Sequence, residues 1–100
     1  MGKLDKKTAI ITGGGKGIGY GLARAFAREG ANLVLTGRTL SRLEAAKEKL
    51  EAEFGVKVLP IVADGADEAA IANVVSEAVK TFGHIDVLVN NAQVSKSGVM

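Results

Sequence analysis

Residues 12–19 read T-G-G-G-K-G-I-G, and this glycine-rich segment decides how the rest of the chain is interpreted. It follows a short β-branched run, Thr8–Thr12, and precedes a stretch in which apolar residues recur at helical spacing from Ile18 onward. Glycine permits tight turns and a close approach to a ligand, and a helix N-terminus offers unpaired N–H groups to phosphates. A strand, a glycine loop and a helix in this order therefore predict a site for the pyrophosphate of a dinucleotide.

The residues that we predict to cradle the pyrophosphate all belong to this segment. A ligand-free turn is the less favoured alternative, because so many glycines cost backbone entropy and a turn of this length needs fewer. The segment is not a P-loop, since Lys16 is followed by Gly17 rather than by serine or threonine. The predicted pyrophosphate-binding residues are Gly13, Gly15, Gly17, Ile18 and Gly19.

Beyond this segment, short apolar runs and amphipathic helical patterns alternate along the chain. This alternation is typical of a parallel sheet with helices on both faces. Right-handed crossovers then predict a doubly wound, Rossmann-type α/β fold, βαβαβαβ, with strand order 3-2-1-4. Pro60 weakens the prediction for the second half of the third strand, because proline has no N–H to donate. The expected strands are residues 8–12, 32–36, 56–62 and 85–90. For the second helix, either Ser41 and Glu44 form a capping box or Thr39 is the cap. Asp67 is expected to cap the third helix.

The composition bounds the classes of function. The chain has 100 residues, no cysteine and one histidine, His84, which excludes disulfides, a cysteine nucleophile and a structural zinc site. The 13 Lys+Arg residues are scattered against 11 Asp+Glu, and a single tyrosine offers little for base stacking, so nucleic-acid binding is disfavoured. No apolar run is long enough for a membrane span or a signal-peptide core, so we expect a cytoplasmic protein without a membrane partner.

Two motifs in register resemble the short-chain dehydrogenase/reductase family. The first is T-G-x-x-x-G-x-G at residues 12–19, and the second is N-N-A at residues 90–92, preceded by I-D-V-L-V. The resemblance implies an NAD(P)(H)-dependent oxidoreductase that transfers hydride between its cofactor and a small-molecule carbonyl or alcohol substrate. It also implies that residues 1–100 are the N-terminal cofactor-binding part of one domain, which we expect to be truncated after the fourth strand and to form a homo-oligomer.

The end of the second strand predicts which cofactor is bound. Dinucleotide folds usually place an acid there for the ribose 2′-hydroxyl, whereas this chain has T-G-R-T at residues 36–39 and no acid before Glu44. The guanidinium of Arg38 can pair with a 2′-phosphate, and the family associates basic residues at this position and at Lys16 with NADP(H). We therefore predict NADP(H), with NAD(H) as the second choice. The plain alternative is that both side chains are solvated surface charges.

The resemblance assigns further residues to the adenine and the ribose. Asp64 would accept a hydrogen bond from the adenine amino group, with the backbone of Gly65 beside it, and the equal alternative is that Asp64 caps the next helix. Asn91 and Ala92 would pass along the cofactor ribose. Gln93 stands where the family usually has glycine. The backbone path or the polar groups beside the nicotinamide are therefore expected to differ from the family pattern.

No catalytic residue is assigned within these residues. The family supplies its general acid/base through Tyr-x-x-x-Lys, but Tyr20 is the only tyrosine and is followed four residues later by Arg24. We therefore expect the 100 residues alone to be inactive, and His84 and Asp86 to be structural. One alternative is a non-catalytic dinucleotide-binding or redox-sensing module. The other is an S-adenosylmethionine-binding fold, which Arg38 disfavours because such sites tend to have an acid there.

Overall fold

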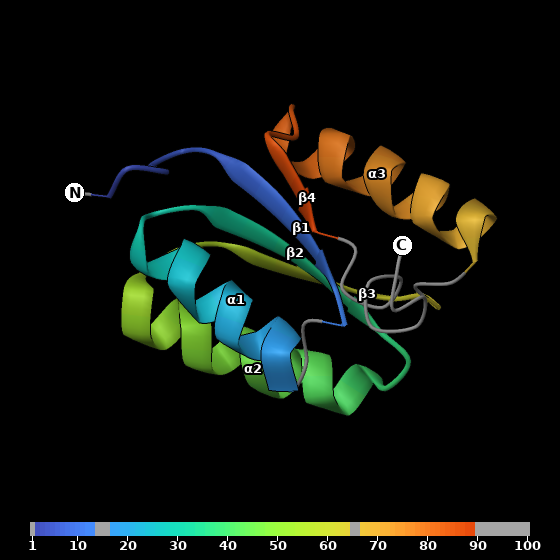
Figure 1. Ribbon diagram of the computed structural model, residues 1–100, viewed down its shortest axis with the longest axis horizontal. Coiled ribbons are helices and arrows are strands. Elements are labelled where there is room, and N and C mark those ends of the chain that lie inside the picture. The colour runs from blue at the N-terminus through green and yellow to red at the C-terminus, as the bar shows by residue number, and fades with distance from the viewer. Residues whose placement is uncertain (1, 14–16, 65–66, 90–100) are drawn as a thin grey trace.

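The computed structural model describes residues 2–13, 17–64 and 67–89, and Figure 1 shows a central sheet with helices on either side. Strands and helices alternate along the described residues, as the sequence predicts. The elements are β1 (Thr8–Thr12), α1 (Gly17–Arg28), β2 (Asn32–Gly37), α2 (Leu40–Phe54), β3 (Val58–Val62), α3 (Glu68–Phe82) and β4 (Val87–Val89).

The strands are parallel and lie in the order β3-β2-β1-β4, which confirms the predicted topology. β1 pairs with β2 over its whole length, whereas β4 contributes only three residues opposite Ala9–Ile11. Helices α1 and α2 lie on one side of the sheet and α3 lies on the other (Figure 1). The chain therefore has the doubly wound, Rossmann-type α/β fold.

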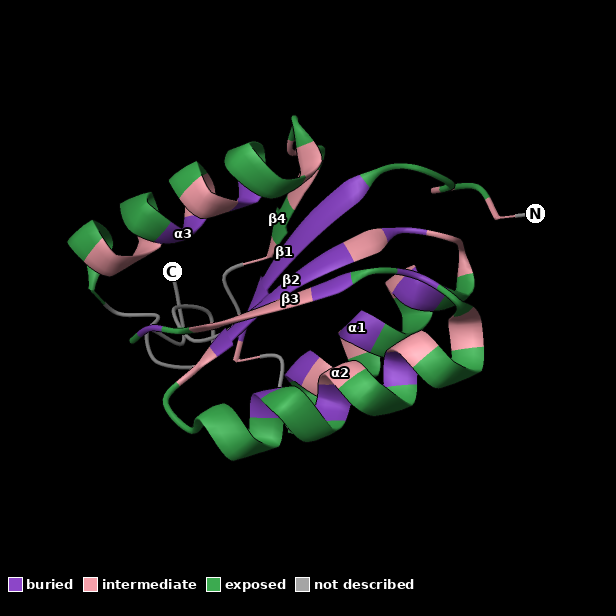
Figure 2. Cartoon of the chain, turned by 180° about the vertical axis from the view of Figure 1, so that it is seen from behind, coloured by how far each residue is buried: buried purple, intermediate pink, exposed green. Residues whose placement is uncertain are grey.

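Two apolar clusters hold the helices against the sheet. Successive strand residues point to opposite faces, so Ile11 packs toward α1 and α2 while Ile10 packs toward α3. Figure 2 shows that the central strands β1 and β2 are mostly buried while the outer faces of the helices are exposed. The cluster under α1 and α2 includes Leu33, Leu35, Leu43 and Leu50, and the cluster under α3 includes Val34, Val74 and Ala78.

The ends of three elements differ from the sequence-based boundaries. The third strand starts at Val58 rather than at residue 56, and the fourth starts at Val87 because Ile85 packs toward α3 before pairing begins. The capping box at Ser41 is wrong, since α2 already begins at Leu40 and Thr39 is its N-cap. Thr39 makes no side-chain capping hydrogen bond, so α2 depends on its buried face rather than on its cap.

The outer side of β3 is shaped by Pro60. The carbonyl of Lys57 accepts from the N–H of Leu33, and the N–H of Ala63 donates to Gly37, so the odd-numbered residues of β3 face β2. The backbone nitrogen of Pro60, which carries no hydrogen, therefore faces away from β2. No hydrogen bond between β2 and β3 is lost, and the strand continues to Val62. The N–H of Val58, which also faces outward, donates to Oε2 of Glu51 on α2 at 2.9 Å.

Candidate functional site

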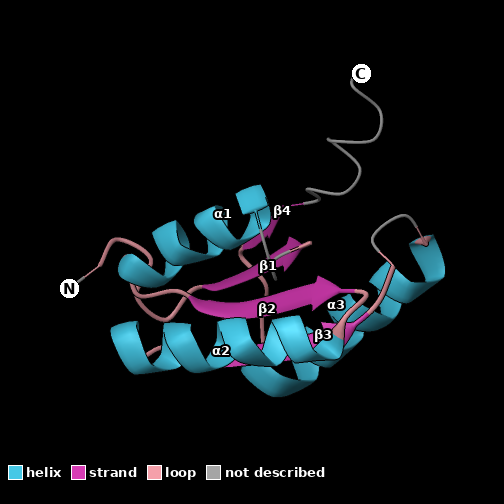
Figure 3. Cartoon of the chain, turned by 90° about the horizontal axis from the view of Figure 1, so that it is seen from below, coloured by secondary structure: helices cyan, strands magenta, loops and turns pink. Residues whose placement is uncertain are grey.

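The predicted cofactor residues gather at one edge of the sheet. All the strand arrowheads in Figure 3 point the same way, so the carboxyl ends of β1, β2 and β3 lie at a common edge. Gly13 follows β1, Arg38 follows β2 and Asp64 lies two residues past β3. Ligands of open α/β sheets bind outside the carboxyl ends of the strands, so the sequence motifs and the topology indicate the same place.

Backbone conformation at this edge requires glycine at two positions. Gly13 has a φ of 69° and donates its N–H to the carbonyl of Thr36 at 2.8 Å, which ties the start of the loop to β2. Gly17 has a φ of 62° and is the first residue of α1, and a Cβ added there would meet nothing within 4 Å. The space beside Gly17 is therefore open to a ligand at the N-terminus of a helix.

The first turn of α1 suits an anionic ligand. Ile18 is 75% exposed although it is a large apolar residue, and Gly19 is buried against the sheet. This turn contains no acidic residue, so no carboxylate competes for the partial positive charge of the helix N-terminus. The open space at Gly17 and the helix dipole together fit the phosphates of a dinucleotide.

Arg38 is the charged group nearest in sequence to the end of β2. It is exposed, and it follows Gly37, where an added Cβ would stand 3.4 Å from the side chain of Leu43. A guanidinium rather than a carboxylate thus stands at this position, and the assignment of Arg38 to a 2′-phosphate stays a prediction.

Asp64 does not cap the helix that follows it, so that alternative is wrong. The N-cap of α3 is Asp67, whose carboxylate accepts from the N–H groups of Ala69 at 3.0 Å and Ala70 at 3.3 Å. The carbonyl of Asp64 accepts from the N–H of Asp67, and the residue is exposed at the carboxyl edge. The adenine assignment for Asp64 remains a prediction.

Several predicted site residues lie outside the described residues. These are Gly15, Lys16, Gly65, Asn91 and Ala92, together with Gln93 and with Asn90 at the end of the expected fourth strand. Their assignments stay predictions from the sequence.

Tyr20 and Arg24 have structural surroundings between α1 and α2. Arg24 makes a two-pronged ion pair with Glu53, with nitrogen–oxygen distances of 2.6 and 3.2 Å, and its guanidinium lies 5.3 Å from the ring centre of Phe54. The hydrogen bond that Arg24 donates to Glu53, followed by its hydrogen bond with Tyr20, raises the pKa of Arg24 above its ordinary value. This ion pair joins α1 and α2 at the surface. Helix α1 contains no lysine that could be the catalytic partner of Tyr20.

One contact near the site was not predicted from the sequence. The hydroxyl of Thr12 donates to the carbonyl of Val89 at 3.3 Å, which ties the start of the glycine-rich segment to β4. The only sequence signal was that Thr12 opens the T-G motif, and its partner is 77 residues away. Within residues 2–13, 17–64 and 67–89, no group of three potential metal ligands comes together and no helix is long and apolar enough to cross a membrane.

Comparison with known proteins identifies the family. Residues 7–100 match the family described as short chain dehydrogenase. The chain belongs to this family. Over 99% of its length it is 53% identical to a 12alpha-hydroxysteroid dehydrogenase from a Clostridium species, of which it covers 40%.

Solved structures of the short-chain dehydrogenases agree with this assignment. The crystal structure of L-sorbose reductase from Gluconobacter frateurii, complexed with NADPH and L-sorbose, matches with a TM-score of 0.84 and 43% identity, over 91% of this chain and 34% of that one. An alcohol dehydrogenase from Thermococcus sibiricus, complexed with 5-hydroxy-NADP, matches with a TM-score of 0.77 and 36% identity, over 82% of this chain and 35% of that one. The chain thus spans well under half the length of the relatives it matches.

Proposed function

We propose that this chain is the NADP(H)-binding part of a single-domain short-chain oxidoreductase that acts on a small carbonyl or alcohol substrate. The bound nicotinamide would supply or accept the hydride. Family membership supports the reaction class, and two structural neighbours were solved with NADPH or an NADP derivative. The residues that choose the substrate are not assigned within this chain.

The chain's own residues would bind and orient the dinucleotide. The backbone from Gly13 to Gly19 would hold the pyrophosphate at the N-terminus of α1, with Gly17 leaving room for its oxygens. Arg38 and Lys16 would pair with the 2′-phosphate, and Asp64 with Gly65 would bind the adenine. Asn91 and Ala92 would lie along the ribose.

The observation that carries the cofactor preference is Arg38 in place of a carboxylate at the end of β2. An acid at this position would hydrogen-bond a ribose 2′-hydroxyl and repel a 2′-phosphate. A guanidinium attracts the phosphate through charge-assisted hydrogen bonds. The preference for NADP(H) over NAD(H) therefore depends on this one side chain more than on any other described residue.

The test is to compare the affinities of NADPH and NADH for the protein and for its Arg38→Gln variant. Losing a hydrogen bond to a charged group should weaken NADPH binding by about 10- to 100-fold. NADH, which has no 2′-phosphate, should bind both proteins alike. Arg28→Gln is the matched control, because Arg28 is an exposed arginine at the opposite end of α1.

Either of two results would overturn the proposed preference: NADPH affinity that Arg38→Gln leaves unchanged, or an equal loss for both dinucleotides. Turnover is a separate readout, with a hydroxysteroid and a ketose as first substrates because two relatives are named for them. Turnover of any carbonyl or alcohol by these 100 residues would overturn the expectation that they are inactive alone.

A further inference from the structure

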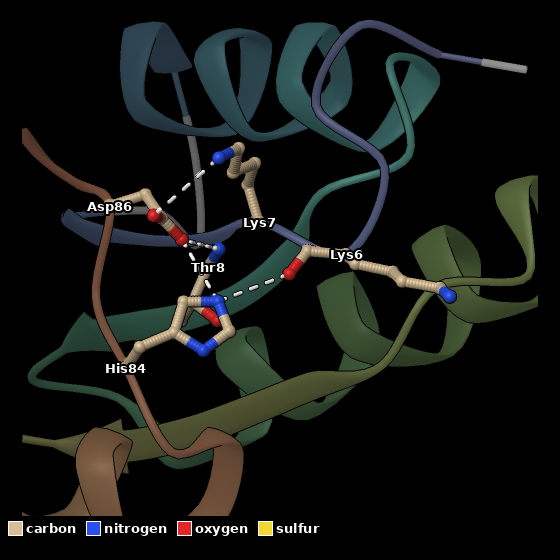
Figure 4. A network of polar contacts seen from close by, with 5 residues as sticks. All are labelled: Lys6, Lys7, Thr8, His84 and Asp86. Atoms are coloured by element: carbon tan, nitrogen blue, oxygen red, sulfur yellow. Dashed lines mark hydrogen bonds and ion pairs between the residues drawn. The ribbon is translucent and has the colours of Figure 1, made fainter.

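A polar network joins the beginnings of β1 and β4 at the amino edge of the sheet, opposite the cofactor edge. Figure 4 shows Asp86 and His84 from the approach to β4 facing the backbone of Lys6 and Thr8. The N–H of Thr8 donates to Oδ2 of Asp86 at 2.9 Å, and the N–H of Asp86 donates to the carbonyl of Thr8 at 2.9 Å. This reciprocal pair binds the two chain segments in a fixed register.

His84 adds a bridge to this pair. Its Nε2 lies 3.1 Å from the carbonyl oxygen of Lys6 and 3.0 Å from Oδ2 of Asp86. A carbonyl and a carboxylate can only accept, so Nε2 must carry a hydrogen and share it between them. The tautomer of the neutral ring is therefore fixed by its two partners, with the hydrogen on Nε2 and the lone pair on Nδ1.

Lys6 has the backbone conformation that the bridge depends on. Its φ is 67°, and it is the only described residue other than glycine with a positive φ. A side chain in this region strains the backbone, and such strain persists only where surrounding contacts compensate for it. The hydrogen bond from His84 to the Lys6 carbonyl is such a contact.

We infer that His84 and Asp86 form a clasp that fixes the register of β4 on β1. Within the described residues, β4 pairs with β1 through three residues, so the contacts just before it make up much of its attachment there.

The Asp86 carboxylate has a second charged neighbour besides the imidazole. Nζ of Lys7 stands 4.0 Å from its other oxygen, Oδ1. The side chain of His84 is about half exposed.

The first test is ¹⁵N NMR of histidine-labelled protein, with the His84→Gln spectrum identifying the signals. We expect the neutral ring to carry its hydrogen on Nε2, and the Thr8 and Asp86 amides to be protected from exchange. A neutral ring with its hydrogen on Nδ1 would overturn the clasp, and so would rapid exchange of both amides.

The second test uses two replacements of different chemistry. His84→Leu removes the donor and should speed exchange of the Thr8 and Asp86 amides about tenfold, while β2 amides such as that of Val34 are unchanged. His84→Gln supplies an amide N–H of similar reach and should restore most of the protection. Equal exchange in both variants and the parent protein would contradict the clasp. Lys6→Gly, which keeps the carbonyl and relieves the strain, should leave the protection intact.

Discussion

The two faces of the sheet are built differently. Toward α1 and α2, the strands contribute Leu33 and Leu35, and α2 meets them with Leu43 and Leu50, all of them fully buried. Toward α3, β4 carries Leu88, which shares a row with Ile10 and is half exposed. Within the described residues, one face thus has a fully buried leucine core, whereas on the other face α3 leaves Leu88 half exposed.

The faces also differ in buried polarity. Thr8, Thr12 and Thr36 alternate with apolar residues so that they lie on the α3 face, and all three are fully buried. The hydroxyls of Thr8 and Thr36 have no hydrogen-bond partner among the residues that the structure describes. A buried unpaired hydroxyl costs free energy, so the α3 face loses stability that the α1/α2 face keeps. The difference shows that burial alone does not measure what a face contributes.

The largest expected effect compares one leucine from each face. Leu50→Ala should lower the free energy of unfolding by about 2–5 kcal/mol, because the side chain is fully buried and leaves a cavity. Leu88→Ala should cost under about 1 kcal/mol, since half of that side chain already contacts water. Urea unfolding of both variants measures the two values. Similar losses would mean that the α3 face is as complete as the other.

The second prediction concerns the unpaired hydroxyl of Thr36. Thr36→Val keeps the side-chain shape and removes the unpaired group, so it should raise the free energy of unfolding by about 1 kcal/mol. Thr12→Val is the matched control, because its hydroxyl donates to Val89 and its loss should destabilise. Thermal unfolding of the two variants should shift in opposite directions. A loss of stability in both would disprove the claimed cost of the Thr36 hydroxyl.

The smallest effect distinguishes the helix caps. Asp67 accepts two N–H groups of α3, so Asp67→Ala should cost about 1 kcal/mol. Thr39 accepts none at the start of α2, so Thr39→Ala should change stability by only a few tenths of that value. Denaturant midpoints of the two variants provide the comparison. If Thr39→Ala proves the more costly, α2 relies on its cap after all and the contrast between the helices fails.

Most of the fold could be predicted because its signals are local. The β-branched run at residues 8–12, the apolar spacing of α3 and the cap at Asp67 each lie within a few positions, and each prediction is confirmed. For α2 the sequence left two caps open, and the structure has Thr39 rather than Ser41, because the helix already begins at Leu40. Ser41 has the right spacing to Glu44, so local spacing alone could not decide between them.

The candidate site divides in the same way. Gly13 and Gly17 are predicted from motif spacing and Arg38 from its place after the second strand, and the parallel topology brings all three to one edge. Their roles in binding stay predictions. The tie from Thr12 to Val89 and the bridge from His84 to Lys6 join residues more than 70 positions apart. No pattern in the sequence indicates which distant backbone carbonyl a side chain will meet, because that depends on the packed sheet.

The proline in β3 affects how this protein behaves when crowded. An exposed strand edge is a template on which other chains can add strands and aggregate. Three residues of β3 turn their backbone nitrogens outward: Val58, Pro60 and Val62. Pro60 has no N–H, and the N–H of Val58 is already bonded to Glu51. Only the N–H of Val62 is affected by neither the proline nor Glu51. The β3 side of the sheet is thus protected against fibril-like growth.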